Sequence, residues 1–174
     1  MNIKKPKFWD KKKPNFIAYL LSPISKLLQI SKSLKKDKNL NFPEIKVVCV
    51  GNIYIGGTGK TPLSIKISQL LSERNLKTAV IKKFYIDQKD EQIILSKKTN
   101  LISKKTREEA LTSAIKQNFK FAILDDGLQD KSINYDLKIC CFSSNNWIGN
   151  GLTIPAGPLR EGIISIKNFD IIFL

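Results

Sequence analysis

The sequence predicts a three-layer α/β domain built on a mostly parallel sheet. Short β-branched runs alternate with segments of helical spacing, an order that places helices on both faces of such a sheet. A glycine-rich turn follows the first run and leads directly into a helical segment, and a later run ends in two aspartates. Ligands of parallel α/β folds bind at the carboxyl ends of the strands, so we expect the functional site there.

Composition and charge are those of a globular protein with a basic N-terminus. The 174 residues suffice for one domain with a buried core, and 42% of them are hydrophobic. The net charge is +15, of which residues 1–40 contribute +9. Only three of the 30 basic residues are arginine, whose planar fork proteins use to read base edges. We therefore expect no nucleic-acid partner.

Residues 1–40 are predicted to be a basic membrane-anchoring segment with an amphipathic helix. The apolar stretch is about 15 residues long, which is short for a spanning helix but suits one lying in the membrane interface. Trp9 and Tyr19 would then lie at headgroup depth, with lysines on anionic lipid. The alternative is a helix whose apolar face packs on the domain's own core. That face carries Phe16, Tyr19, Leu20, Pro23, Ile24, Leu27 and Leu28.

Residues 44–61 have the layout of a phosphate-binding loop. Ile45–Val50 forms a strand, and glycines 56, 57 and 59 let the backbone N–H groups turn around a polyphosphate. The helix that opens at Lys60 adds the positive end of its dipole. The strict pattern has glycine six positions before this lysine, where the chain has Tyr54. The alternative is a glycine-rich hairpin turn with an incidental Gly-Lys-Thr.

We expect this loop to bind the phosphates of a nucleotide. Lys60 would reach the β- and γ-phosphates, and the hydroxyl of Thr61 would contact Mg²⁺. The residues predicted to contact the nucleotide are Tyr54, Ile55, Gly56, Gly57, Thr58, Gly59, Lys60 and Thr61.

The rest of the chain completes a P-loop NTPase-like domain over residues 41–174. Helices are expected at residues 62–73, 93–98 and 106–117, the last with Thr106 and Glu109 spaced as a capping box. Core strands are expected at residues 78–81, 101–103, 119–124, 137–142 and 169–174.

Two aspartates end the predicted strand at residues 119–124. In a phosphate-loop fold this position holds the second Mg²⁺ contact, so Asp125 or Asp126 would join Thr61 at the metal. The alternative is a simple Asp-Gly turn. The chain has no histidine, so acid–base chemistry must use carboxylates, lysine or a partner. The three cysteines lie in apolar runs and are expected to be small core residues.

Residues 50–62, 125–129 and 149–161 together resemble the tetraacyldisaccharide 4′-kinase family. Such enzymes transfer the γ-phosphate of ATP to the 4′-hydroxyl of an acylated glucosamine disaccharide in lipid A biosynthesis. The resemblance covers nearly the whole chain. It implies ATP and Mg²⁺ as cofactors, an acylated disaccharide lipid as substrate, and a location at the cytoplasmic face of the inner membrane of a Gram-negative bacterium.

The resemblance also implies roles for individual residues. Asp90 matches the family's aspartate that helps to activate the sugar hydroxyl, and Arg160 and Glu161 would line the site. The implied catalytic residues are therefore Asp90, Lys60 and Arg160, with Thr61, Asp125 and Asp126 at the metal.

The chain departs from the family pattern at several points. Residues 82–85 replace a Ser-Arg-Gly-Tyr-Gly loop, and Asp130 stands where the family has histidine. The family's second lobe has no counterpart, so a complementing lobe or chain is an expected partner. One alternative is a truncated, non-catalytic remnant that binds nucleotide or a partner. Another is a membrane-associated P-loop ATPase, which would have lysine in place of Ile55.

Overall fold

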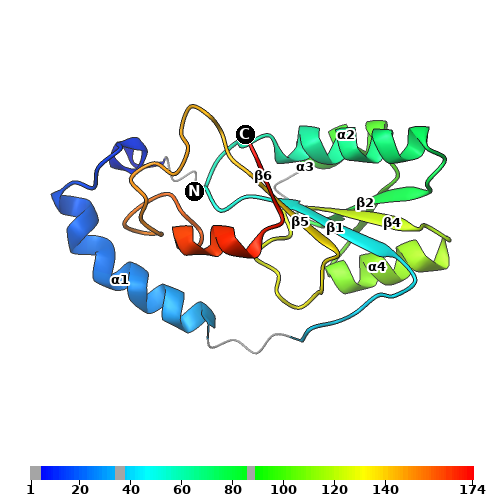
Figure 1. The fold of residues 1–174 in the computed structure, drawn as a ribbon, viewed down its shortest axis with the longest axis horizontal. Coiled ribbons are helices and arrows are strands. Elements are labelled where there is room, and N and C mark those ends of the chain that lie inside the picture. The colour runs from blue at the N-terminus through cyan, green and yellow to red at the C-terminus, as the bar shows by residue number, and fades with distance from the viewer. Residues whose placement is uncertain (1–4, 34–37, 86–88) are drawn as a thin grey trace.

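A computed structural model describes residues 5–33, 38–85 and 89–174 (Figure 1). Its centre is a six-stranded sheet of order β3-β2-β4-β1-β5-β6. Every neighbouring pair of these strands is parallel, which confirms the predicted sheet. The strands are β1 (Lys46–Gly51), β2 (Thr78–Lys83), β3 (Leu101–Lys104), β4 (Phe121–Asp125), β5 (Leu137–Cys141) and β6 (Ile171–Phe173).

Helices cover both faces of the sheet and give the predicted three layers. In Figure 1, α2 (Lys60–Glu73) lies above the sheet and α4 (Arg107–Lys116) lies below it. The third helix, α3 (Lys89–Lys98), contacts α2 and β3. A short 3₁₀ helix, η3 (Ile163–Asn168), precedes β6.

Successive side chains of each central strand enter opposite apolar clusters. In β1, Val47 and Cys49 belong to the cluster with α4, whereas Val48 and Val50 belong to the cluster with Ile65 of α2. Strands buried on both faces read as continuous apolar runs, which is why the sequence revealed them. The three cysteines are buried as predicted. Burial raises the pKa of Cys140 to about 12 and that of Cys141 to about 11, so both are neutral thiols.

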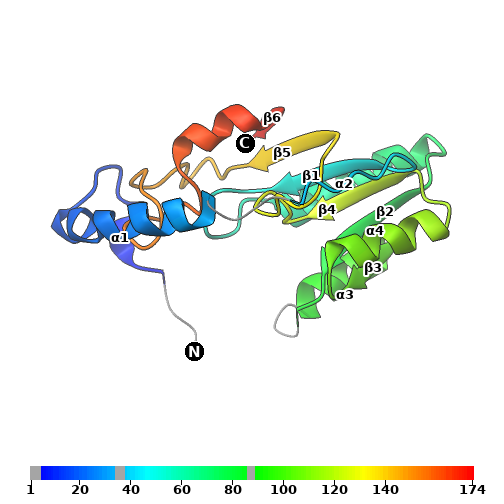
Figure 2. The ribbon, with the colours of Figure 1, turned by 90° about the horizontal axis from the view of Figure 1, so that it is seen from below.

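The helix α1 (Phe16–Ser33) lies apart from the sheet, beside the loop at residues 150–160 (Figures 1 and 2). The buried Ser25 hydroxyl donates to the Thr153 carbonyl at 2.9 Å and accepts from the Ala156 N–H at 3.1 Å. Ala18 is also buried, so small residues make the packed side of the helix. Further along, the Gln29 amide donates to the Arg160 carbonyl at 3.3 Å. Small and polar side chains therefore hold α1 against the loop at residues 150–160 of the same chain.

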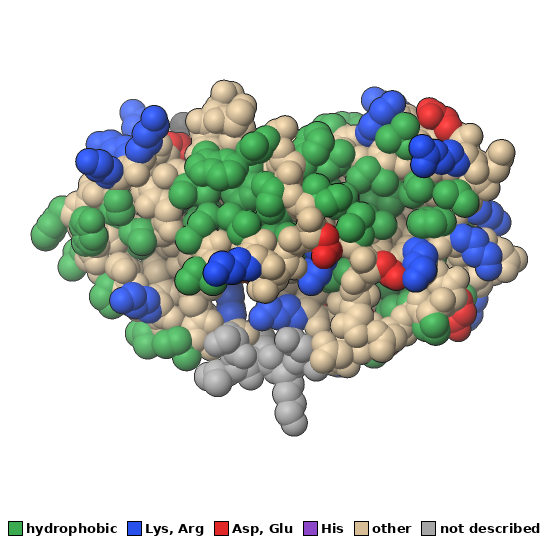
Figure 3. All heavy atoms as spheres, viewed as in Figure 1, with side chains coloured by type: hydrophobic (Ala, Val, Ile, Leu, Met, Phe, Trp, Pro, Cys, Tyr) green, Lys and Arg blue, Asp and Glu red, His purple; other side chains and the backbone are tan. Residues whose placement is uncertain are grey.

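The large apolar side chains of α1 face outward. The idea that they pack on the domain's own core is therefore wrong. Figure 3 shows hydrophobic side chains along the end of the molecule that α1 forms, with basic side chains near η1 (Lys7–Asp10). Among the described residues no helix is both long and apolar enough to cross a membrane. The exposed residues are Phe16, Ile17, Tyr19, Leu20, Ile24, Leu27, Leu28 and Ile30.

Two sequence-based expectations about this region and the C-terminus are wrong. Trp9 is buried, and its indole N–H donates to the Pro155 carbonyl at 3.1 Å, so it packs on its own chain rather than facing headgroups. The strand predicted at residues 169–174 exists as β6, but it is an exposed sheet edge rather than a core strand because only β5 pairs with it. Residues 1–4 and 34–37 of the predicted anchoring segment lie outside the described residues.

Candidate phosphate-binding site

The buried side chain of Asn52 fixes the conformation of the loop between β1 and α2 by hydrogen bonds. Its amide nitrogen donates to the Tyr54 carbonyl at 2.6 Å, to the Gly56 carbonyl at 3.3 Å and to the Thr58 hydroxyl oxygen at 2.9 Å. Gly56 and Gly59 have φ values of +139° and +77°, which other residues rarely adopt. The sequence analysis missed Asn52, although an amide directly after a buried strand can organise a turn.

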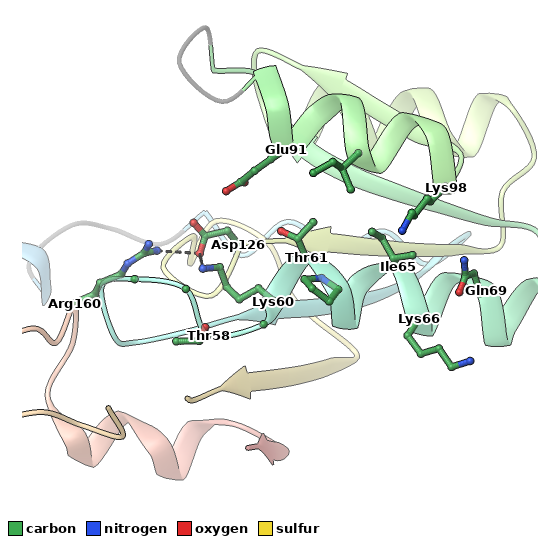
Figure 4. Close-up of a pocket in the computed structure, with 15 residues that line it drawn as sticks. Thr58, Lys60, Thr61, Ile65, Lys66, Gln69, Glu91, Lys98, Asp126 and Arg160 are labelled. Atoms are coloured by element: carbon green, nitrogen blue, oxygen red, sulfur yellow. Dashed lines mark hydrogen bonds and ion pairs between the residues drawn. The ribbon is translucent and has the colours of Figure 1, made fainter. Parts of the chain in front are cut away.

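A cavity of about 740 Å³ opens above the loop and between α2 and α3 (Figure 4). A Cβ atom added at Gly57 or Gly59 would meet nothing within 4 Å, so the loop borders open space. The first N–H groups of α2 have no intrahelical partner and carry the positive end of the helix dipole. The cavity is lined by Gly56, Gly57, Thr58, Gly59, Lys60, Thr61, Pro62, Ile65, Lys66, Gln69, Glu91, Ile94, Lys98, Asp126 and Arg160.

Two cations and one carboxylate meet at the loop end of this cavity. Arg160 Nη1 lies 2.9 Å and Lys60 Nζ 3.8 Å from the same oxygen, Oδ1 of Asp126 (Figure 4). Asp126 has a left-handed backbone with φ +62°, stabilised by Arg107, whose Nη2 donates to the Asp126 carbonyl at 2.6 Å. Lys60 and Arg160 thus already surround an anionic oxygen and can turn to a phosphate oxygen.

Asp125 lies deeper than Asp126 and is fully buried. Its carboxylate accepts from the Thr61 hydroxyl at 3.1 Å, the Ser64 hydroxyl at 3.0 Å and the Lys82 ammonium at 2.9 Å. Lys82 also pairs with Glu91 in the first turn of α3. Burial alone would lower the pKa of Lys82, but the two carboxylates outweigh it and hold the pKa above its usual value of 10.5. Sequence reasoning missed both Lys82 and Glu91.

The predicted site residues divide into two groups. Residues 56–61, Asp126 and Arg160 come together at the cavity, and Asp125 lies directly beneath Thr61. Tyr54 and Ile55 do not line the cavity, because the Tyr54 side chain turns toward the N-terminal segment and the Ile55 N–H donates to the Pro158 carbonyl.

Two further residues that the family resemblance placed at the site, Asp90 and Glu161, do not line the cavity either. Asp90 lies in the first turn of α3 with an exposed side chain, and the neighbouring Glu91 lines the cavity in its place. Glu161 is absent from the wall that the described residues form.

The donor set suits Mg²⁺ that arrives with a polyphosphate. Among the described residues no cluster of three or more His, Cys, Asp or Glu could hold a metal alone. Mg²⁺ needs only one or two carboxylates when phosphate oxygens and water complete its octahedron. Thr61, Asp125 and Asp126 offer a hydroxyl and two carboxylates of this kind beside the loop.

A family model described as tetraacyldisaccharide-1-P 4′-kinase matches residues 17–174. The chain belongs to this family. The matched region therefore includes the glycine-rich loop, the two aspartates at the end of β4 and the loop ending at Arg160. It also includes α1 from its second residue onward.

Relatives and a solved structure agree with this membership. The chain is 53% identical over its whole length to the tetraacyldisaccharide 4′-kinase of Pelagibacter ubique, covering 55% of that protein. It is 36% identical to that of Rickettsia canadensis, with 90% of this chain and 52% of the relative covered. The chain thus spans about half the length of these curated relatives. A crystal structure of LpxK from Aquifex aeolicus in complex with ATP matches 90% of this chain and 56% of that one, with a TM-score of 0.72 and 22% identity, which shows the shared fold.

Proposed function

We propose that this chain is the nucleotide-binding part of a kinase that transfers the γ-phosphoryl group of ATP to the 4′-hydroxyl of a tetraacyl glucosamine disaccharide 1-phosphate in lipid A biosynthesis. The observation that carries the proposal is the pairing of Lys60 and Arg160 on one oxygen at the mouth of an open glycine-rich loop. The names of the family and its relatives supply the substrate class.

The geometry at the loop supports ATP as the ligand. The phosphates would lie on the backbone N–H groups of residues 56–61 and the α2 N-terminus, where dipole and charge favour anions. Lys60 and Arg160 would leave Asp126 and bind phosphate oxygens, where they stabilise the charge of the transition state. Thr61, Asp125 and Asp126 would hold Mg²⁺, which when bound neutralises charge on the β- and γ-phosphates.

Asp90 is the proposed acceptor of the proton from the sugar hydroxyl. As the alcohol oxygen bonds to the γ-phosphorus, the bond to the bridging β-oxygen breaks, and ADP leaves. A carboxylate in the first turn of α3 lies beside Glu91, which reaches the cavity from the side opposite the loop. Asp90 would have to come within hydrogen-bond reach of the acceptor in the complex, as catalytic groups often do only once substrate is bound.

We also propose that α1 binds the cytoplasmic face of the inner membrane. Its outward face carries eight exposed apolar side chains, while its packed side uses small and polar ones. A helix of this kind lies in the lipid interface, where it could meet an acyl-chain substrate that stays in the bilayer. The anchoring segment would be residues 1–40 and the kinase domain residues 41–174, completed by a second lobe or chain.

One pair of variants separates nucleotide binding from phosphoryl transfer. Lys60→Ala removes the cation at the phosphates, so ATP affinity should fall about 10- to 100-fold. Asp90→Asn should keep ATP affinity but lower transfer of labelled phosphate to the disaccharide in vesicles. Calorimetric titration with Mg-ATP measures the first effect, and radiolabelled product measures the second.

The control is Lys116→Ala, which removes an exposed lysine in the last turn of α4 and should change neither readout. Unchanged ATP affinity in the Lys60 variant would contradict the phosphate-loop assignment. Unaltered protein that binds ATP and transfers no phosphate would instead favour a nucleotide-binding remnant or the need for a second lobe.

A further inference from the structure

Tyr54 occupies the position where a strict phosphate-binding loop has glycine, and it does not line the cavity. The residue is 1% exposed. Its carbonyl accepts from the buried Asn52 amide at 2.6 Å, so its backbone belongs to the framework that keeps the loop open. Movement of the Tyr54 side chain would therefore move the phosphate-binding backbone.

The Tyr54 hydroxyl is held by two charged residues of the N-terminal segment. It donates to Asp10 Oδ1 and accepts from Lys5 Nζ at 2.8 Å, and Lys5 Nζ also lies 2.7 Å from the same Asp10 oxygen. The Lys5 ammonium is 5.0 Å from the centre of the Tyr54 ring, within cation–π range. Burial alone would raise the pKa of Asp10, but hydrogen bonds from Lys5 and Tyr54 outweigh it and lower the pKa below 3.8. The three groups thus form one closed cluster.

This cluster lies on the same short segment that leads into α1. Asp10 ends η1, and the Asn15 side chain caps the start of α1 five residues later by accepting from the Ala18 N–H at 3.0 Å. Trp9, next to Asp10, fixes the segment to the loop at residues 150–160, since its carbonyl accepts from the Asn150 N–H at 2.9 Å. The exposed apolar helix and the phosphate loop are therefore both connected to this one segment.

We propose that Asp10 and Lys5 are positioning residues for the phosphate loop, and that through Tyr54 they couple the binding of α1 to an anionic lipid surface with the binding of ATP. The inference rests on the proposed function. Lipid that holds α1 and η1 in place would restrict the Tyr54 cluster before nucleotide arrives, so ATP binding would order fewer groups and become tighter. By linkage, ATP would strengthen binding to the lipid by the same factor.

The test measures ATP affinity with and without vesicles of phosphatidylglycerol, by titration with a fluorescent ATP analogue. In the unaltered chain, vesicles should tighten ATP binding about three- to tenfold. Tyr54→Phe keeps the buried ring and removes one hydroxyl. This variant should bind ATP more weakly in solution and lose the response to vesicles. Asp10→Asn should do the same, whereas Lys5→Arg, which keeps the cation, should preserve the response.

Glu44→Gln is the control for Asp10→Asn, because it removes an exposed carboxylate outside both α1 and the cluster. It should respond to vesicles like the unaltered chain. A thermal unfolding scan identifies variants that are merely less stable. A vesicle response that survives in Tyr54→Phe, or no response in the unaltered chain, would overturn the coupling. Absence of any ATP binding by the unaltered chain would instead contradict the proposed function.

Discussion

Lys82 is the cation on which the deepest carboxylate of the site depends. Its ammonium and the Asp125 carboxylate are both almost completely buried, with side-chain exposures of 4% and 0%. Glu91, its other partner, is 53% exposed and therefore far better screened by water. Taking either charge away from the inner pair leaves the other without compensation in a medium that solvates it poorly.

We expect Lys82→Met to destabilise the fold by about 3 kcal/mol, the scale for removing one member of a buried ion pair. Neutralising the partner as well, in Lys82→Met with Asp125→Asn, should recover much of this loss because no unpaired charge remains. Urea unfolding in magnesium-free buffer measures both variants.

The control is Lys83→Met, next along β2, where the described residues offer the ammonium only the Tyr85 ring and no carboxylate. Lys83→Met should lower the free energy of unfolding much less than Lys82→Met does. Equal losses for the two single variants would show that the Lys82–Asp125 pair contributes nothing specific.

Local sequence patterns predicted several residues that the structure brings together at the candidate site. The loop glycines, Lys60 and Thr61 follow from a strand, a turn and a helix read in order, and the aspartates from the end of the apolar run of β4. Lys82 could not be found in this way, because its partner Asp125 is 43 residues away and only the pairing of β2 with β4 brings them together. The same holds for Arg107 and Asp130, which are 23 residues apart in the sequence and pair at 2.9 Å.

Among the secondary-structure elements, α1 has an unusual distribution of side chains. A surface helix normally buries its large apolar residues and exposes the small and polar ones. Here Ala18 and Ser25 are buried, whereas Phe16, Leu20 and Leu27 are at least two-thirds exposed. Contiguous exposed apolar surface of this kind marks an interaction site, and the lysines around it favour an anionic partner.

We expect Leu20→Glu with Leu27→Glu to weaken binding to phosphatidylglycerol vesicles at least about tenfold, since each leucine contributes up to about 2 kcal/mol when buried in an apolar phase. The fold should be unaffected, because both side chains already face solvent. Co-sedimentation with vesicles measures the effect.

Ile164→Glu is the control, since it introduces the same charge at an exposed apolar residue of η3, outside α1. It should leave sedimentation unchanged. Full vesicle binding by the α1 double variant would show that another part of the chain makes the lipid contact.

Elements whose signals are local were predicted well. The expected cap at Thr106 is present, and its hydroxyl accepts from the Glu109 N–H at 3.2 Å. The apolar runs of β1, β2 and β4 could be recognised because both faces of these strands are buried. The error at β6 has the opposite cause: an apolar run indicates a strand, but its place at the sheet edge depends on which strands come beside it.

At the scale of the whole molecule, carboxylates hold loops to the sheet at both of its ends. Asp136 accepts from the Val47 N–H and from Lys46 at the start of β1, and Asp130 accepts from Arg107 and from the Ser132 N–H at the opposite end. Burial alone would raise the pKa values of both carboxyls, but these hydrogen bonds outweigh it and lower them below 3.8.

A lowered carboxyl pKa makes the fold labile to acid. The stabilisation is complete above the unfolded-state pKa of 3.8 and is lost as pH falls through the lower folded-state values. The free energy of unfolding should therefore drop steeply below about pH 4 and change less steeply in Asp130→Asn. Urea unfolding across this range measures the slopes.

Glu44→Gln is the control, because this exposed carboxylate has no partner among the described residues. Its pH dependence should match that of the unaltered chain. If the free energy of unfolding of the Asp130 variant falls equally steeply with pH, the Arg107 and Ser132 contacts do not stabilise this charge in solution.

The contacts that hold α1 against the loop at residues 150–160 also set the order of events during synthesis. The helix is made early, but Thr153 and Arg160, which accept from its Ser25 and Gln29 side chains, follow 128 and 131 residues later. At typical rates of elongation that interval lasts roughly 10 s. The apolar side of α1, which this loop does not cover, would thus be exposed from the start, before the contacts that hold the helix on the domain can form. If α1 binds lipid as proposed, we expect ribosomes translating this message to gather at the membrane before the nucleotide site has folded.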